Sequence, residues 1–284
     1  MCPDVHHFYD PDTNSLTYVV AEPGGSGAVI IDQVLDYDAR SGRTATRSAD
    51  KLLGFVRERG LTIEWLLETH IHADHVTAAS YLKAALGART GIGQGVRAVQ
   101  ATWTAIYNLD GAAGPAAFDR LLADGDSLAV GGLAVQVIAT PGHTPSCVSY
   151  LIGDALFVGD TLFMPDFGTA RCDFPGGDAA TLYRSIQRQY ALSPETRIFV
   201  CHDYQPGGRA LAFETTVAAQ RAANKHVRDG VSEAEFVALR GERDRTLSTP
   251  ALLLPAIQLN IRGGALPAAE ANGNAYLKIP LNRI

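Results

Sequence analysis

Short apolar runs alternate with amphipathic stretches along the first quarter of the chain. Residues 16–20 are rich in β-branched and aromatic side chains, and a glycine-rich break separates them from a second apolar run at 28–32. Both runs predict strands, the second of them buried. Residues 48–59 place leucine and valine side chains on one face, which predicts an amphipathic helix, and residues 65–68 predict the next strand.

The rest of the chain predicts further strands and then helices. Gly131-Gly132 and Gly153-Asp154 indicate β-hairpin turns, because each pair lies between two apolar runs. The other elements expected are helices at 76–86, 178–190 and 213–227, a strand at 197–200, and a helix that begins at a capping box of Ser232 and Glu235.

Helices that flank a central set of strands favour one architecture. Two sheets packed face to face, with helices on both outer faces, give an α/β fold of four layers, the αββα sandwich. We expect a single domain over residues 1–284, with a helical and extended C-terminal tail from about residue 205.

Composition narrows the class of protein. Apolar residues make up 46% of the chain, which is enough for a sizeable core, and the formal net charge of −6 argues against nucleic-acid and membrane partners. The N-terminus has no basic region followed by an apolar stretch, and no apolar run reaches the length of a membrane span. We therefore expect a cytoplasmic protein. Its four cysteines form no Cys-x-x-Cys pair, which predicts free thiols at Cys2, Cys147, Cys172 and Cys201.

A dense group of potential metal ligands follows the predicted strand at 65–68. His70, His72, Asp74 and His75 fall within six residues. Imidazole and carboxylate groups suit zinc, iron and manganese, and ligand clusters directly after strands are typical of metal or catalytic sites. A surface loop with scattered histidines is the alternative, but the chain has only 8 histidines.

Three further strand ends carry the same residue types. His143 lies in the loop Thr-Pro-Gly-His-Thr-Pro, Asp160 follows an apolar strand, and His202 follows the strand at 197–200. Each residue alone would be an ordinary polar loop residue. Their convergence at strand ends predicts one shared metal centre.

The pattern His-x-His-x-Asp-His, Gly-His, Gly-Asp and Cys-His resembles the metallo-β-lactamase superfamily from about residue 16 to His202. The resemblance implies the αββα sandwich with the metal at one edge of the sheets. In dinuclear members, His70, His72 and His143 would hold one metal and Asp74, His75 and His202 the other, with Asp160 bridging them. Two zinc ions would activate water, whereas a single Fe(II) would leave open positions for substrate and O2.

Residues 165–174, with Tyr204 after His202, resemble the persulfide dioxygenase branch of that superfamily. This resemblance implies oxidation of glutathione persulfide with O2 at one Fe(II) per chain, held by His70, His143 and Asp160. His72, Asp74, His75 and His202 would then orient the iron ligands by hydrogen bonds.

The same resemblance implies two substrate-binding residues. Arg171 would bind a carboxylate of glutathione and Tyr204 would line its groove. The chain departs from the family's Gly-Arg-Thr-Asp-Phe segment, since it has Ala170-Arg171-Cys172-Asp173-Phe174. The role of Cys172, like that of Cys201, stays open.

Three rival functions stay open. A glyoxalase II-like hydrolase with two zinc ions would cleave a thioester or lactone, although no separate glutathione-binding helical domain is recognised after Tyr204. A true β-lactamase would be expected outside the cytoplasm, and a non-catalytic metal-binding protein would show no turnover. The sequence also leaves open whether the chain forms a homodimer. The remaining histidines, His6, His7 and His226, are expected to be solvated.

Overall fold

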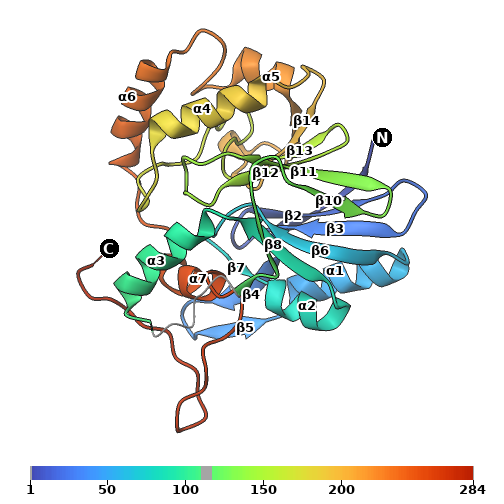
Figure 1. The fold of residues 1–284 in the computed structure, drawn as a ribbon. Helices are drawn as coiled ribbons and strands as arrows, with labels where there is room; N and C mark the ends of the chain where they lie inside the picture. Colours follow the sequence, from blue (N-terminus) through green and yellow to red (C-terminus); the bar gives the residue numbers. More distant parts are fainter. Residues whose placement is uncertain (1, 110–116, 284) are drawn as a thin grey trace.

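The computed structural model describes residues 2–109 and 117–283, and shows two large sheets packed face to face with helices on both outer faces (Figure 1). Helices α4, α5 and α6 cover one sheet, and α1 and α2 cover the other. The predicted αββα sandwich is confirmed. Within these residues, no helix is both long and apolar enough to cross a lipid bilayer.

The first sheet has six strands in the order β1-β2-β3-β6-β8-β9. Its N-terminal strands are antiparallel, whereas β3, β6, β8 and β9 run parallel. The strands are β1 (Asp4–Asp10), β2 (Ser15–Ala21), β3 (Gly27–Ile31), β6 (Thr62–Glu68), β8 (Arg89–Gly93) and β9 (Arg120–Leu122).

The second sheet also has six strands, and their order follows the sequence. They are β10 (Ser127–Val130), β11 (Leu133–Ala139), β12 (Val148–Ile152), β13 (Ala155–Phe157), β14 (Arg197–Phe199) and β15 (Glu214–Thr216). A small third sheet contains β5 (Arg43–Ala45), β4 (Val34–Asp38) and β7 (Val76–Thr77).

The helices pack their apolar faces onto these sheets. They are α1 (Arg47–Glu58), α2 (Ala79–Leu86), α3 (Val96–Tyr107), α4 (Ala179–Tyr190), α5 (Val217–Ala223), α6 (Glu233–Asp244) and α7 (Leu253–Asn260), with a short 3-10 turn at Pro206–Gly208. The capping box of Ser232 and Glu235 is present at the start of α6. Helix α7 lies beside α3, so the C-terminal part of the chain returns to the first sheet.

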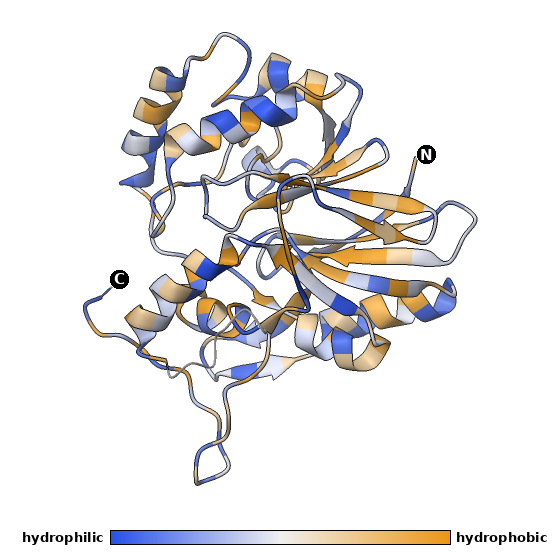
Figure 2. Cartoon of the chain, in the orientation of Figure 1, coloured by the Kyte–Doolittle hydropathy of each residue, from blue (hydrophilic) through white to orange (hydrophobic). Residues whose placement is uncertain are grey.

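The main core lies between the two large sheets, where Figure 2 shows the strands as mostly hydrophobic. Tyr18 of the first sheet contacts Phe157 and Phe199 of the second edge to face, with ring centroids 5.2 and 5.6 Å apart. Aromatic pairs in this geometry add to the free energy gained from burial of apolar surface. The core therefore fixes the two sheets relative to each other, and with them the strand ends that carry the polar motifs.

Several local predictions were wrong. The segment 76–86 begins as the strand β7 before α2, because residue 76 pairs with residue 35 of β4. The segment 213–227 contains a strand, β15, and only the short helix α5. His6 and His7 belong to β1; His6 is partly buried, and His7 is exposed but stacked on Phe213 at 3.7 Å between ring centroids. In each case pairing or packing with a distant segment outweighs the local pattern.

Candidate metal centre

The potential ligands come from loops that follow strands of both sheets. The loop after β6 carries His70, and the loops after β11, β13 and β14 carry His143, Asp160 and His202. A backbone hydrogen bond of 2.8 Å from the Leu16 amide to the Cys201 carbonyl joins the two sheets at this edge. The convergence that the sequence pattern predicts is therefore present.

Two histidines and one carboxylate form the first ligand set. His70, His143 and Asp160 are buried, and their ligand-type atoms all lie within 4.8 Å of one another. Oδ2 of Asp160 is 3.8 Å from Nε2 of His70 and 3.7 Å from Nε2 of His143. Two imidazoles and one carboxylate on one face are the donor set of mononuclear non-haem iron sites.

A second ligand set lies beside the first. His72, Asp74, His75 and His202 also place ligand-type atoms within 4.8 Å of one another. Nε2 of His202 is 3.2 Å from Oδ2 of Asp74 and 3.3 Å from Oδ1 of Asp160, so Asp160 touches both sets. His72 thus groups with the second set, whereas the resemblance to dinuclear members places it with His70 and His143.

Unpartnered polar atoms test whether these residues fit a metal ion. Among the described residues, five buried ligand-type atoms of the two sets have no hydrogen-bond partner: Nε2 of His70, Nδ1 of His72, Nε2 of His75, Nε2 of His202 and Oδ1 of Asp160. Buried polar atoms are nearly always hydrogen-bonded, and a missing ion is one accepted reason for exceptions. The donor chemistry and the unpartnered atoms both fit a metal centre.

Hydrogen bonds at the opposite ring nitrogens fix the orientation of the first set. Nδ1 of His143 donates to the carbonyl oxygen of Arg171 at 2.7 Å. The hydroxyl of Thr69 donates to Asp32 at 2.9 Å, so it accepts the bond from Nδ1 of His70 at 3.0 Å. Both contacts place the proton on Nδ1 and leave the Nε2 lone pair available to a metal.

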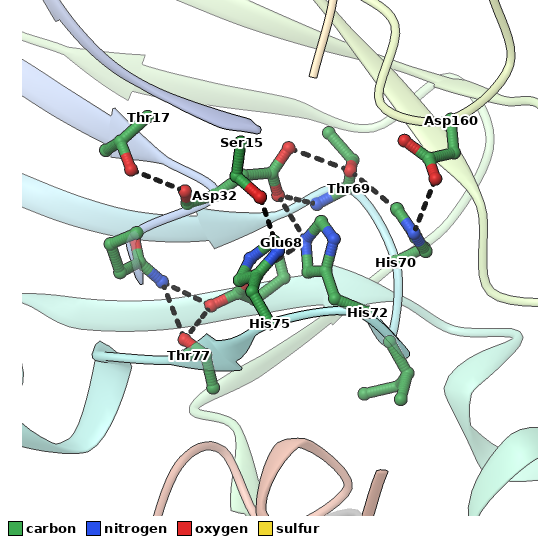
Figure 3. A network of polar contacts seen from close by, with 12 residues as sticks. Ser15, Thr17, Asp32, Glu68, Thr69, His70, His72, His75, Thr77 and Asp160 are labelled. Atoms are coloured by element: carbon green, nitrogen blue, oxygen red, sulfur yellow. Dashed lines mark hydrogen bonds and ion pairs between the residues drawn. The ribbon is translucent and has the colours of Figure 1, made fainter. Parts of the chain in front are cut away.

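Asp32 is the centre of a buried polar network behind the ligands (Figure 3). Its carboxylate accepts hydrogen bonds from the Thr69 amide at 2.7 Å and from Nε2 of His72 at 3.0 Å. Glu68 approaches the same ring nitrogen, with 3.4 Å between its Oε2 and Nε2 of His72. The ring of His72 is therefore held through Nε2, and its Nδ1 is the unpartnered atom.

Burial and neighbouring charges set the protonation states of the protein groups. Burial, together with the nearby histidines, holds the pKa of His70 well below its usual value, which keeps the ring neutral as a ligand must be. Burial also lowers the pKa of His72, but the carboxylates of Asp32 and Glu68 outweigh it and hold that pKa well above the usual value. For Asp74, burial raises the pKa, and the imidazoles of His202 and His75 more than reverse this effect.

A cavity of about 390 Å³ opens directly over the ligands. His143, Asp160 and Asp74 line it, and Phe167 and Tyr204 form an aromatic wall with stacked rings whose centroids are 4.6 Å apart. Much of the remaining lining comes from the C-terminal part of the chain, namely Arg240, Arg243, Leu247, Ser248, Pro250, Ala251 and Leu252. The volume falls in the range of small-molecule binding sites.

The two predicted substrate residues, Arg171 and Tyr204, both line this cavity, but they differ in exposure and in the contacts they make within the protein. Tyr204 is 39% exposed and belongs to the aromatic wall. Arg171 donates to both oxygens of Asp173 at 2.6 Å and to the carbonyl oxygen of Ser248 at 2.7 Å. The charge of Arg171 is thus already compensated inside the protein, and its predicted contact with a substrate carboxylate stays a prediction.

The expected solvated state of His226 was wrong. Its side chain is 5% exposed, and Nδ1 accepts a hydrogen bond of 3.0 Å from the Thr169 amide. Of the cysteines, Cys147, Cys172 and Cys201 are buried, and all four are free thiols as predicted. Sγ of Cys201 lies within 4.8 Å of ligand-type atoms of Asp160 and His202, directly behind the second set.

Sequence reasoning missed several residues that hold the centre in place. Asp32 follows β3 as the ligands follow their own strands, so the same strand-end signal would have found it. Asn260 gave no such signal. Its amide donates to the carbonyl oxygens of His72 and His75, both at 2.8 Å, and its oxygen accepts from the Thr77 amide at 2.9 Å.

The fold agrees with that of a known superfamily. Residues 10–202 match the metallo-beta-lactamase superfamily, and the chain belongs to that superfamily. A solved structure, ETHE1 from Myxococcus xanthus, superposes with a TM-score of 0.75 at 30% identity, covering 92% of this chain and 100% of its own.

Three curated relatives carry names of different kinds. A probable metallo-hydrolase of Burkholderia pseudomallei is 50% identical over 99% of both chains. Glyoxylase B2 of Dictyostelium discoideum is 49% identical over 96% of this chain and 95% of its own. The mitochondrial persulfide dioxygenase ETHE1 of Homo sapiens is 31% identical over 92% of this chain and 88% of its own. The chain is therefore a metallo-β-lactamase superfamily enzyme, and these names do not assign its reaction.

Proposed function

We propose that this protein is a persulfide dioxygenase that uses one Fe(II) per chain, with glutathione persulfide and O2 as substrates. The observation that carries the proposal is the compact set of His70, His143 and Asp160, which supplies two imidazoles and one carboxylate; His143 and Asp160 line the cavity. Bound iron would supply the activation of O2. The overall reaction converts persulfide, O2 and water into sulfite, thiol and two protons.

The residues around the ligands have separate roles in this proposal. The hydrogen bonds to Nδ1 of His143 and His70 keep both rings in the tautomer that binds metal. The stacked rings of Phe167 and Tyr204 would exclude water from one side of the bound substrate. Likeness to ETHE1 from Myxococcus xanthus supports this reading, since its structure superposes over nearly the whole chain.

The segment after residue 205 belongs, in our proposal, to the same domain as the ligands. Its residues line the cavity and bond to the ligand loop through Asn260. A tail that folded separately would leave the cavity without one side.

A dinuclear zinc hydrolase of the glyoxalase II type is the second candidate. The set formed by His72, Asp74, His75 and His202 favours it, because it could hold a second metal next to the first. The names of the Burkholderia and Dictyostelium relatives also point to this class. A metal-bound hydroxide would then attack a thioester or lactone.

Oxygen uptake by anaerobically purified, Fe(II)-loaded protein separates the two candidates. With glutathione persulfide, we expect one sulfite released for each O2 consumed. The matched control is zinc-loaded protein with S-lactoylglutathione. Hydrolysis in that control, together with no O2 uptake by the iron form, would replace the dioxygenase by the hydrolase.

A further inference from the structure

The mouth of the cavity carries a guanidinium group that no acidic side chain compensates. Arg243 lies near the C-terminal end of α6, is exposed, and lines the cavity together with Tyr204 and Phe167. Among residues 2–109 and 117–283, no carboxylate forms an ion pair with it.

The other two arginines of the cavity are already engaged. Arg171 makes its bidentate contact with Asp173. Arg240 is buried and paired with Asp244 one helical turn away. A bound anion would therefore meet two compensated cations and one uncompensated cation, Arg243.

A second cation lies against the aromatic wall of the cavity. Nζ of Lys225 is 5.0 Å from the centroid of the Phe167 ring, which lines the cavity. Burial lowers the pKa of Lys225, and the positive charge of Arg243 lowers it further. Asp166, the nearby acid, is itself paired with Arg209 at 2.6 and 3.0 Å.

Arg243 lines the cavity and Lys225 lies against its aromatic wall, and neither forms an ion pair within the described residues. The chain carries a net charge of −6, so these two cations are a local exception to its overall sign. Like charges repel each other, and an anion that reached both cations would relieve that repulsion and gain charge-assisted hydrogen bonds. A guanidinium is especially suited to a carboxylate, because its planar N–H groups match the two oxygens.

We propose that Arg243 and Lys225 form the binding site for a carboxylate of the substrate, so that the enzyme selects acidic thiol carriers over neutral ones. This inference rests on the proposed function for the reacting end of the substrate. The metal ligands at the base of the cavity would receive the sulfur, and the two cations at its mouth would bind the far end of the carrier. Arg171, with its charge compensated, contributes to the shape of the wall.

Binding of glutathione and of its diethyl ester to Fe(II)-loaded protein, measured by anaerobic calorimetry, tests this site without turnover. The ester has no carboxylates but keeps the thiol. We expect R243Q to weaken glutathione binding by about tenfold, and K225Q by less, because a hydrogen bond to a charged group contributes that order of affinity. The ester should bind more weakly to the wild type and be insensitive to R243Q.

Arg245 provides the matched control, since it is exposed, lies two residues further along, and is absent from the cavity lining. R245Q should bind glutathione as the wild type does. Equal affinity of R243Q and wild type for glutathione would overturn the proposal, as would failure of the wild type to bind glutathione. An equal loss of glutathione affinity in R245Q would also overturn the proposal, because the effect would then come from the net charge of the protein and not from a specific site.

Kinetic measurements test the carboxylate site separately from the proposed reaction. In the persulfide assay, R243Q should raise KM about tenfold and change kcat far less, because Arg243 is not one of the candidate metal ligands. If the wild type oxidises no persulfide but R243Q still weakens glutathione binding, the proposed reaction fails and the carboxylate site stands. If R243Q oxidises persulfide with the same KM as the wild type, the proposed reaction stands and the carboxylate site fails.

Discussion

The side-chain amide of Asn260 donates a hydrogen bond of 2.8 Å to the carbonyl oxygen of His72, although the two residues are 188 positions apart. Asn260 is 2% exposed and lies at the end of α7, well beyond the part of the chain that matches the superfamily. The C-terminal segment is therefore part of the support of the metal centre. The loop that carries His72 is held from the outside by a helix that follows both sheets.

Asn260→Ala should destabilise the protein by about 2–4 kcal/mol, because it leaves buried carbonyl and amide groups of the ligand loop without partners. Urea unfolding measures this loss. Asn272→Ala is the control, since Asn272 is exposed, and its effect should stay within about 0.5 kcal/mol. Equal unfolding midpoints for wild type and Asn260→Ala would show that α7 does not support the loop.

His143→Ala and His75→Ala should differ in bound iron. Loss of His143 removes a ligand of the first set, so the variant should lose its iron and its O2 uptake. Loss of His75 should leave about one iron per chain and reduce activity by at most about 10- to 100-fold, as is typical of residues that act behind the ligands. Elemental analysis gives the stoichiometry. Iron retained in His143→Ala, or lost equally in both variants, contradicts the mononuclear assignment.

Arg240→Met should cost about 3–5 kcal/mol of folding free energy, because it leaves Asp244 buried without its cation. Asp244 also accepts a hydrogen bond of 2.8 Å from the Cys172 amide, so the loop beside Arg171 should loosen as well. Adding Asp244→Asn keeps an acceptor for that amide and removes the unpaired charge. The double variant should recover at least about half of the loss in urea unfolding. If the double variant recovers no stability, the loss in Arg240→Met comes from the packing of the Arg240 side chain and not from the unpaired charge of Asp244.

The stability of the protein should fall with acid partly because of His226. Burial, with the charges of Arg240, Lys225 and Arg243, lowers the pKa of His226 to about 3. An unfolded histidine has a pKa near 6.5, so between these two values the unfolded state binds the extra proton and folding is opposed. The stabilising contribution is therefore present above about pH 6.5 and is lost progressively towards pH 3, by at most about 1.4 kcal/mol per pH unit.

His226→Gln tests this dependence, since it removes the titrating ring and keeps an acceptor in the side chain. Urea unfolding from pH 4 to pH 8 should show a smaller loss of stability in the variant than in the wild type. Parallel curves for the two proteins would mean that His226 ionises alike in the folded and unfolded states.

The sequence alone determined the architecture and the positions of the candidate ligands. Alternating apolar runs and glycine turns are local patterns, and they indicated most of the strands of the two large sheets. Because polar residues at strand ends meet at one edge of a sandwich, His70, His143, Asp160 and His202 could be grouped before the structure was known. Their metal-binding role stays a prediction.

Only the tertiary structure decided which residues meet across long sequence separations. It placed His72 with the second ligand set, compensated the charge of Arg171 with Asp173, buried His226 and brought Asn260 to the ligand loop. Side chains from α6 and the segment after it complete the cavity, and no local sequence pattern in that segment predicted this role. The physical reason is that hydrophobic periodicity fixes an element and its buried face, whereas hydrogen-bond partners and compensating charges are chosen when distant elements pack.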